Sequence, residues 1–386
     1  MIELLFLLLP VAAYSGWAIG NRDGKKKRQS SEKGQDYVTG LNYLLSEKPD
    51  EAIESFLSIL QIKQETVEIN LALGNLFRRR GEVERAIKMH QNIVARPNLS
   101  HDHRSLAMLE LGLDYLSAGL YDRAESIFLE LLDNEKYRLE SLRQLLVIYE
   151  KTKDWHRAIE ISRSLNSRVD PKVNRTIYHF YCELAQEEWQ KGNVKQGEAY
   201  LKKATQLDKA AARAHLMLAQ MQGQKQQYRQ AIKSFNAVLA AEPQLIVVFL
   251  PELTACYQAL GNYKGYVQLL ADLVELGAGM SVLLEYSEQL KESESPNQIH
   301  DRLVKAISKR PNLKGLQTLL VHFGQRLELE ANENFILIRN ILNQLISSKP
   351  SYSCNQCGFT SNTLYWHCPS CKNWDTIRPI IGVEGD

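Results

Sequence analysis

A pattern of small, aromatic and aliphatic positions recurs along the chain from about residue 35 to residue 350. In each copy an aromatic residue follows a small residue by three positions, and a glycine, an alanine and a bulky residue come after it at helical spacing. Spacings of three and four residues place side chains on one face of a helix. The clearest copy consists of Gly74, Phe77, Gly81, Ala86, His90 and Ile93. The pattern therefore predicts a series of amphipathic helices with a repeated core.

The alanine position of the pattern gives its period. It falls at residues 52, 86, 124, 158, 197, 231, 266 and 299, so the steps are 34, 38, 34, 39, 34, 35 and 33 residues. A period near 34 with these residue types resembles the tetratricopeptide repeat. The resemblance implies two antiparallel helices per unit and an all-α superhelical solenoid of about seven to nine units over residues 35–350. Gly197 and Tyr266 replace the alanine, and the motif is weak over residues 281–349.

The first twenty residues are almost wholly apolar, with Glu3 as the exception. As a helix, residues 2–19 would be about 25 Å long, just enough to span a bilayer. A cleavable signal peptide carries its positive charge before the apolar run, whereas here the cations follow it, at Arg22, Lys25, Lys26, Lys27 and Arg28. We expect an uncleaved transmembrane anchor over residues 1–20 and a basic linker over residues 21–34. A cleaved signal and a buried core helix are the alternatives.

Charge and composition narrow the class of protein. The chain is 44% hydrophobic and 24% charged, with a formal net charge of +2, as in an ordinary folded protein. This balance predicts no nucleic-acid partner, and the positive-inside rule places the bulk of the chain in the cytoplasm. No GxSxG, HExxH, P-loop or GxGxxG motif occurs, so we expect no enzyme activity. His101, Asp102 and His103 fall in a polar insertion between repeats, which we expect to be a solvent-exposed loop.

Six cysteines are present, and four of them form two CxxC pairs near the C-terminus, namely Cys354, Cys357, Cys368 and Cys371. Two residues between thiolates allow a tight turn to direct both sulfurs at one ion, and Gly358 suits such a turn. The four thiolates predict a closed tetrahedral metal site. A pair of disulfides is the alternative, which a reducing cytoplasm disfavours. Cys182 and Cys256 lie in helical stretches and are expected to be buried apolar residues.

The cysteine motifs, Cys-x-x-Cys-Gly and Cys-Pro-x-Cys, resemble the two knuckles of rubredoxin, although only ten residues separate them here. The resemblance implies a shortened, rubredoxin-like ribbon over residues 351–386 with one tetrathiolate-bound Fe or Zn ion, between which the ligands do not discriminate. So small a segment needs its metal to fold, which favours a structural role over electron transfer. The aromatic side chains of Trp366 and Trp374 suggest that the ribbon docks back on the repeats or presents a protein surface.

A solenoid of this kind offers a concave surface on which a partner usually lies. In the tetratricopeptide frame, the first helix of each unit lines that surface. Six candidate partner-binding residues map there: Arg78, Arg79, Arg143, Lys151, Trp189 and Arg213. These cations and one aromatic suit an acidic or amphipathic peptide. The alternative is that they are solvated side chains on exposed helix faces.

The order of the parts resembles the lipopolysaccharide assembly protein B family of Gram-negative bacteria over essentially the full length. The apolar start at residues 1–10 and the ribbon sequences 357–360 and 364–371 carry the resemblance. It implies a non-enzymatic, single-pass inner-membrane adaptor on the cytoplasmic side. Its implied partners are a client, the UDP-3-O-acyl-N-acetylglucosamine deacetylase of lipid A synthesis, the membrane-anchored protease FtsH that degrades this client, and an inner-membrane regulator of lipopolysaccharide level.

Two other functions are compatible with the same parts. One is a membrane-tethered scaffold for envelope-synthesis enzymes, and the other is a rubredoxin-type electron-transfer protein. A scaffold would leave turnover of the deacetylase unchanged, and electron transfer would require a redox-active iron. The oligomeric state stays open, and a homo-oligomer is compatible with the sequence.

Overall fold

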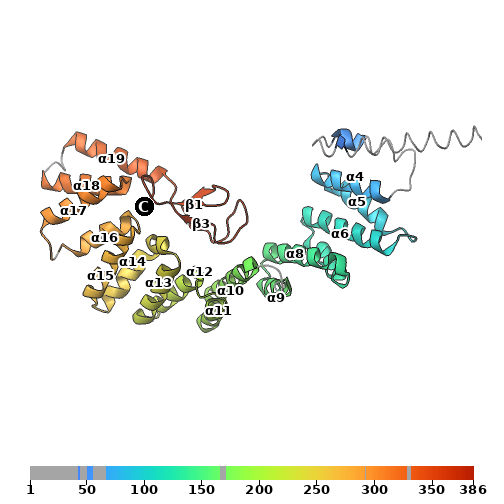
Figure 1. The fold of residues 1–386 in the computed structure, drawn as a ribbon, viewed down its shortest axis with the longest axis horizontal. Coiled ribbons are helices and arrows are strands. Elements are labelled where there is room, and N and C mark those ends of the chain that lie inside the picture. The colour runs from blue at the N-terminus through green and yellow to red at the C-terminus, as the bar shows by residue number, and fades with distance from the viewer. Residues whose placement is uncertain (1–41, 44–49, 55–66, 166–170, 292, 328–331) are drawn as a thin grey trace, which may run out of the picture. The chain divides into compact units, whose positions relative to one another are not determined.

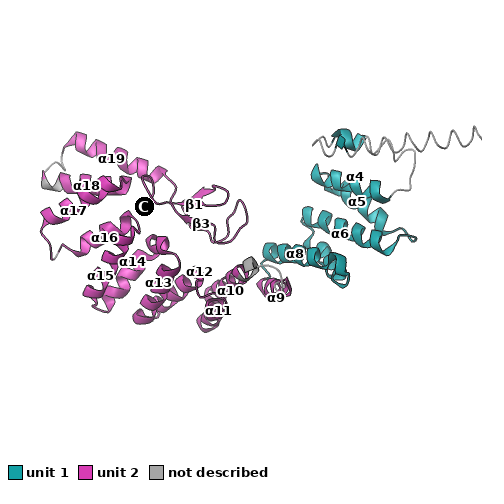
Figure 2. Cartoon of the chain, viewed as in Figure 1, with its two compact units in different colours: residues 1–154 teal, residues 155–386 magenta. Residues whose placement is uncertain are grey.

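The computed structural model of the protein describes residues 42–43, 50–54, 67–165, 171–291, 293–327 and 332–386. These residues belong to two compact units, residues 1–154 and residues 155–386, which are treated separately (Figure 2). The predicted anchor and basic linker lie outside the described residues. None of the helices described combines the length and the apolarity needed to cross a bilayer.

Helical hairpins make up the first unit (Figure 1). Its described elements are α4 (Val67–Arg79), α5 (Val83–Val94), α6 (His101–Ser117), α7 (Tyr121–Glu130), the 3-10 turn η1 (Leu131–Asp133) and α8 (Glu135–Thr152). Helix α4 packs on α5, and α6 packs on α7, in the order of the chain. The unit therefore follows the two-helix repeat that the sequence period predicts.

The second unit continues the same architecture and adds a small sheet. Its helices are α9 (Trp155–Leu165), α10 (Pro171–Gln190), α11 (Val194–Leu207), α12 (Ala212–Gln224), α13 (Tyr228–Ala241), the 3-10 turn η2 (Pro243–Leu245), α14 (Ile246–Ala259), α15 (Tyr263–Leu276), α16 (Met280–Gln289), α17 (Pro296–Lys309), α18 (Leu313–Arg326) and α19 (Glu333–Ser348). Its strands are β1 (Tyr352–Cys354), β2 (Thr360–Ser361) and β3 (Ile377–Pro379). The all-α solenoid and the C-terminal ribbon are confirmed.

Burial confirms the repeat frame. The alanine position is buried in every described copy, including the three that carry Gly197, Tyr266 and Ile299 instead. Gly112 shows why the first position of the pattern is small. A Cβ there would lie 2.8 Å from the ring of Phe128 on the facing helix. Gly119 ends the same hairpin's first helix with φ +74°, which favours glycine.

One expectation about the turns is wrong. Residues 101–103 form the first turn of α6 and are not a loop. Ser100 caps this helix by accepting a hydrogen bond from the backbone N–H of His103, and Asp102 places a negative charge near the helix N-terminus. Both features stabilise a helix start, so the polar residues begin the helix.

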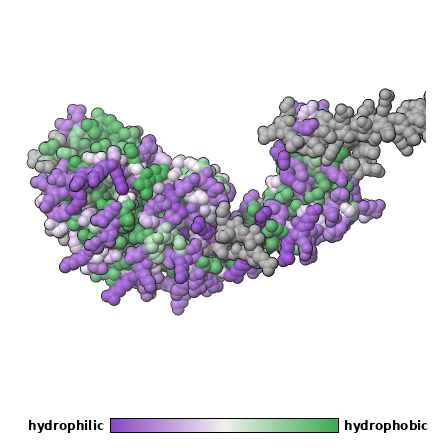
Figure 3. Space-filling view, viewed as in Figure 1, coloured by the Kyte–Doolittle hydropathy of each residue, from purple (hydrophilic) through white to green (hydrophobic). Residues whose placement is uncertain are grey.

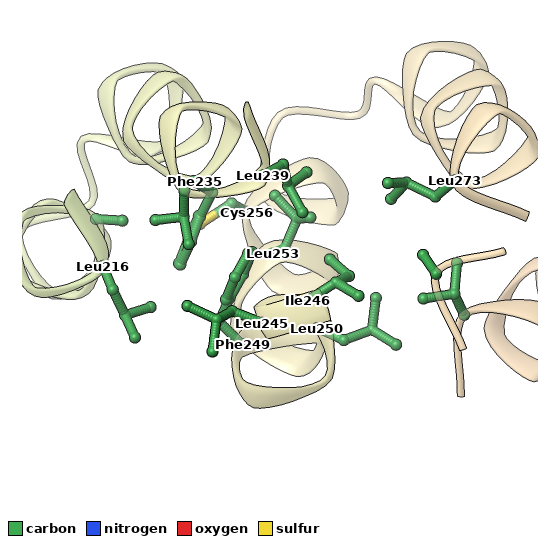
Figure 4. Close-up of a cluster of buried hydrophobic side chains, with 14 of the residues drawn as sticks. Leu216, Phe235, Leu239, Leu245, Ile246, Phe249, Leu250, Leu253, Cys256 and Leu273 are labelled. Atoms are coloured by element: carbon green, nitrogen blue, oxygen red, sulfur yellow. The ribbon is translucent and has the colours of Figure 1, made fainter. Parts of the chain in front are cut away.

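The core of the second unit is built by side chains from successive helices. A continuous cluster runs from Ala212 on α12 to Val282 on α16 (Figure 4). Within it the rings of Phe235 and Phe249 stack with centroids 4.8 Å apart. Each helix thus buries its apolar face against its sequence neighbours. Cys182 and Cys256 are buried as expected, and burial raises the pKa of the Cys182 thiol to about 12.

The ribbon begins directly after the last helix, since α19 ends at Ser348 and β1 starts at Tyr352. Its three strands form an antiparallel sheet in the order β2-β1-β3, with Ser353 opposite Thr360 and also opposite Arg378. Strand β3 packs on η2, so the ribbon lies against the repeats of its own unit.

Candidate metal centre and adjoining cleft

Two turns of the same geometry hold the four cysteines of the ribbon. In the first turn the backbone N–H of Gly358 donates to the carbonyl of Cys354 over 2.9 Å, and in the second the N–H of Lys372 donates to the carbonyl of Cys368 over 3.0 Å. Gly358 and Lys372 both have positive φ, of 74° and 58°. Each turn therefore directs its two sulfurs to the same side, and strand β1 fixes the first turn at Cys354.

The four sulfur atoms are spaced as a tetrahedral metal site requires. Cys354 Sγ lies 3.8 Å from Cys371 Sγ, Cys357 Sγ lies 3.7 Å from Cys368 Sγ, and all four lie within 4.8 Å of one another. A metal–sulfur distance of about 2.3 Å gives a tetrahedron with edges of about 3.8 Å. The separations are far longer than a disulfide bond of about 2.05 Å. The chain's residues therefore fit one tetrathiolate-bound ion, either Fe or Zn.

Hydrogen bonds already favour the thiolate form of part of this set. Burial opposes ionisation of Cys354, but hydrogen bonds from the Thr376 hydroxyl and from backbone N–H groups outweigh it and lower the pKa of this thiol to about 6. Hydrogen bonds from Asn373 lower the pKa of Cys371. Burial raises the pKa of Cys368 to about 11, so this thiol gains most from the positive charge of an ion.

His367 precedes Cys368 but is held away from the sulfurs. Its Nε2 lies 2.8 Å from the carbonyl oxygen of Lys372, and its ring stacks on Trp374 with centroids 4.4 Å apart. His367 therefore stabilises the second turn and is not one of the grouped metal-binding atoms.

An aromatic stack joins the metal turn to the repeats. The ring of Trp374 lies between His367 of the ribbon and His179 of α10, at centroid distances of 4.4 and 4.7 Å and interplanar angles near 20°. Phe180 meets the same indole edge-on at 6.0 Å. The guanidinium carbon of Arg213, on α12, lies 5.9 Å from the Trp374 ring centre. Docking of the ribbon on the repeats is thus confirmed, and Trp374 lies at its centre.

Charged groups surround this stack. Asp375 Oδ2 lies 2.9 Å from His179 Nε2, although neither ring nitrogen of His179 has an aligned hydrogen-bond partner in the described part of the chain. Burial, and then the positive charge of Arg213, lower the pKa of His179 well below 6.5. Burial raises the pKa of Asp375 to about 6. Both shifts oppose a buried ion pair, so His179 packs as a neutral aromatic ring at pH 7.

Three further contacts hold the ribbon and the residues that follow its sheet on the helices. Arg378 on β3 donates two hydrogen bonds to the Glu242 carboxylate, over 2.8 and 3.2 Å, in the bidentate geometry that arginine favours. Beyond the sheet, Lys314 Nζ lies 2.9 Å from Asp386 Oδ1, and the backbone N–H of Leu313 donates to the carbonyl of Val383 over 3.0 Å. The ribbon and the residues after it therefore contact helices near the start of the second unit and near its end.

A cleft lies beside the docked ribbon. Leu364 and Trp366 of the ribbon pack against the core cluster of α12 to α16. Trp366 also forms one side of a cleft of about 490 Å³, whose other lining residues are Gln186, Trp189, Gln190, Arg213, Met217 and Gln220. A second cleft of about 470 Å³ shares Trp189 and Gln220 with it and continues along α12 and α14. The ribbon thus supplies a wall to a surface that the helices alone would leave open.

The six predicted partner-binding residues have different environments. Arg78 lies between repeats, with its guanidinium 2.6 Å from Glu110 and 2.7 Å from the buried Asp114. Arg213 is 4% exposed and pairs with Glu183 at 2.8 Å, beneath the ribbon. Arg79, Arg143 and Lys151 are exposed, and Trp189 is half-buried in the clefts. Binding of a partner by these six stays a prediction, for which Trp189 has the most suitable surroundings.

Sequence reasoning missed the residues on the repeats that receive the ribbon. His179 and Glu242 lie in no motif and are separated from Asp375 and Arg378 by more than a hundred residues. The only signal was the unusual density of aromatic residues around the cysteines. That density indicates a contact but not its partner.

Comparisons with known proteins agree with this architecture. A family model described as a rubredoxin metal binding domain matches residues 352–379, and tetratricopeptide repeat models match residues 71–101 and 182–246. Lipopolysaccharide assembly protein B of Escherichia coli K12 is 38% identical over 388 residues, and that of Haemophilus influenzae Rd is 34% identical over 402 residues. Both alignments cover 100% of this chain and 100% of the relative.

Similarity to solved structures is weaker. The protein in a structure titled "Crystal structure of MamA" is 19% identical, and the match covers 44% of this chain and 94% of that one with a TM-score of 0.33. At that TM-score the match supports no inference about function.

Proposed function

This chain belongs to the lipopolysaccharide assembly protein B family, and on that premise we propose that it is a non-enzymatic adaptor that regulates lipopolysaccharide synthesis. In this proposal it binds the UDP-3-O-acyl-N-acetylglucosamine deacetylase of lipid A synthesis and presents it to the protease FtsH. The observation that carries the proposal is the cleft between Trp189 of the repeats and Trp366 of the ribbon.

The lining of this cleft suits a segment of polypeptide. Two indole rings offer large apolar surfaces that lose little conformational entropy on binding. Gln186, Gln190 and Gln220 add side-chain amides, which both donate and accept hydrogen bonds and can therefore pair with a peptide main chain. A client segment with an apolar or aromatic side chain at its centre fits this combination. The cleft would recognise it by shape and main-chain pairing more than by charge.

A membrane anchor would strengthen such a contact. In the proposal, residues 1–20 span the inner membrane once and the bulk of the chain lies on the cytoplasmic side. Adaptor, protease and the inner-membrane regulator would then share one surface, which raises their effective concentration so that weak contacts suffice. Deleting residues 1–20 should yield a folded protein that no longer supports normal envelope synthesis at native abundance.

The cleft is tested by following the deacetylase in cells. Pulse-chase measures its half-life with the wild-type chain, with Trp189→Ala and Trp366→Ala, and with Leu276→Ala as a control, because Leu276 is 74% exposed and lies outside both clefts. We expect the two tryptophan variants to lengthen the half-life several-fold and the control to match wild type. Metal content shows whether the Trp366 variant keeps its ribbon. An unchanged half-life on deletion of the whole chain would contradict the adaptor and favour a scaffold.

A further inference from the structure

The last helix of the repeat array carries an exposed apolar stripe. On α19, Leu337, Ile338, Ile341 and Leu345 are 57%, 54%, 49% and 48% exposed, and their spacing places them on one face. Figure 3 shows an apolar area over α18 and α19 in the upper left of that view. The terminal helix of a solenoid normally has a polar outer face, because no further repeat covers it. Here the outer face of α19 is apolar, like the face by which an internal repeat packs on its neighbour.

Charge distribution around the stripe argues for a protein occupant. Arg339 is the one charged side chain within α19 after Glu333, and it lies off the stripe by helical position. A helix that lies on an anionic membrane instead has a face rich in lysine and arginine beside its apolar one. The polar positions of α19 are mostly asparagine, glutamine and serine. An apolar helix of another folded protein is therefore the better match.

The sequence of α19 is complementary to itself about Ile341. In an antiparallel pair of identical helices, a residue n positions before the symmetry axis faces the residue n positions after it. Leu337 would then face Leu345, and the acidic Glu333 in the first turn would face the basic Lys349 just past the last turn. Antiparallel helices also align their macrodipoles favourably.

We propose that α19 pairs with the α19 of a second copy of this chain, antiparallel, about a two-fold axis at Ile341. Each copy covers the other's apolar stripe, as a further repeat would. Lys349 already contacts Glu384 of its own chain at 2.8 Å, both side chains being partly exposed, and in the dimer it would lie between two carboxylates. A single helix pair buries less than a standard interface of about 800 Å² per partner, so association depends on concentration and on a shared membrane.

The test uses the full chain in detergent, with sedimentation velocity over a concentration series. Wild type should shift from monomer to dimer. Ile341→Asp should weaken the dimer at least about tenfold, because two copies of the new carboxylate meet at the axis. Leu276→Asp on α15 is the matched control, since it places the same charge at another exposed aliphatic side chain, 74% exposed, outside α19. Thermal melting and metal content establish that each variant is folded.

Charge reversal identifies the predicted register. Glu333→Lys and Lys349→Glu should each weaken the dimer, because like charges then face each other at both ends, while the double variant should restore it. The double variant still lacks the ion pair between residues 349 and 384 of one chain. Restored dimerisation would therefore show that the contact between copies, and not this internal ion pair, is responsible. A wild-type chain that stays monomeric throughout overturns the proposal. So does a dimer that Ile341→Asp leaves intact, or a double variant as weak as the singles.

Discussion

The apolar cluster of the ribbon contains only three buried residues, namely two cysteines and one isoleucine. In the repeats, by contrast, one apolar cluster includes buried side chains from Ala212 on α12 to Val282 on α16. The two regions therefore obtain their stability differently. The repeats bury apolar surface between neighbours, so a defect in one place leaves distant pairs intact. The ribbon has too little apolar surface for that and depends on the ion that its thiolates hold.

The difference matters because the two regions share one surface. Trp374 couples the ribbon to α10, and Trp366 supplies a wall of the cleft. Loss of the metal should therefore alter a binding surface on the repeats without unfolding them.

Replacing Cys354 and Cys357 with serine should remove the metal and the order of residues 351–379. Metal binding contributes on the order of 10 kcal/mol in small zinc modules, far more than the ribbon's core can replace. Metal analysis and limited proteolysis check this, with cleavage expected in the ribbon and protection retained in α12 to α17. Cys256→Ala is the control, because that buried thiol lies outside the metal group. A ribbon that resists protease without metal would contradict the dependence.

The converse experiment weakens the repeats and spares the ribbon. Phe249 is fully buried and stacks on Phe235, so Phe249→Ala should destabilise the repeats around α14 by about 3–5 kcal/mol. Hydrogen exchange should rise in α13 to α15, while metal content stays at one ion per chain. Equal loss of protection in α4 to α7 would show that the array unfolds as a single block.

Trp374→Ala tests the joint between the two regions. Loss of its stacking on His179 and His367 should cost about 1–3 kcal/mol of docking free energy, while the four thiolates stay in place. We expect wild-type metal content with faster hydrogen exchange around His179. Tyr365→Ala is a suitable control, since Tyr365 is 43% exposed and belongs to the same ribbon. Faster exchange in the control as well would assign the effect to the ribbon's own fold.

The stability of the joint between ribbon and repeats should depend on pH through His179 and Asp375. The pKa of His179 lies below 6.5 in the folded chain, so the unfolded chain takes up a proton first and stability falls as pH falls below 6.5. The pKa of Asp375 is raised to about 6 from 3.8, so this group adds stability as pH falls through that window. The difference in free energy of unfolding between wild type and His179→Asn should therefore become smaller as the pH falls. The same difference for Asp375→Asn should become larger. Each change should be at most about 1.4 kcal/mol per pH unit. Thermal melts at several pH values would show parallel curves if neither group titrates differently in the two states.

Local patterns in the sequence predicted most of the fold. The period of the alanine positions gave the helix pairs, because each pair is made by residues fewer than forty apart, and the cysteine spacing gave the metal turns for the same reason. Contacts between distant segments were not predictable. Helical position places Arg78 and Arg213 on the first helices of their repeats but cannot reveal that Asp114 and Glu183 neutralise them. Likewise, nothing near Trp374 in the sequence identifies His179 as its partner.

In the proposed function, the metal-held ribbon completes the client cleft by docking on the repeats. The most direct test of this role is the affinity of the purified deacetylase for the full chain, measured for wild type, for the Cys354→Ser, Cys357→Ser double variant and for Trp374→Ala. We expect both variants to bind at least about tenfold more weakly than wild type, although Trp374→Ala keeps its metal. Wild-type affinity in a Trp374→Ala chain whose ribbon is shown by hydrogen exchange to be undocked would contradict this role of the ribbon.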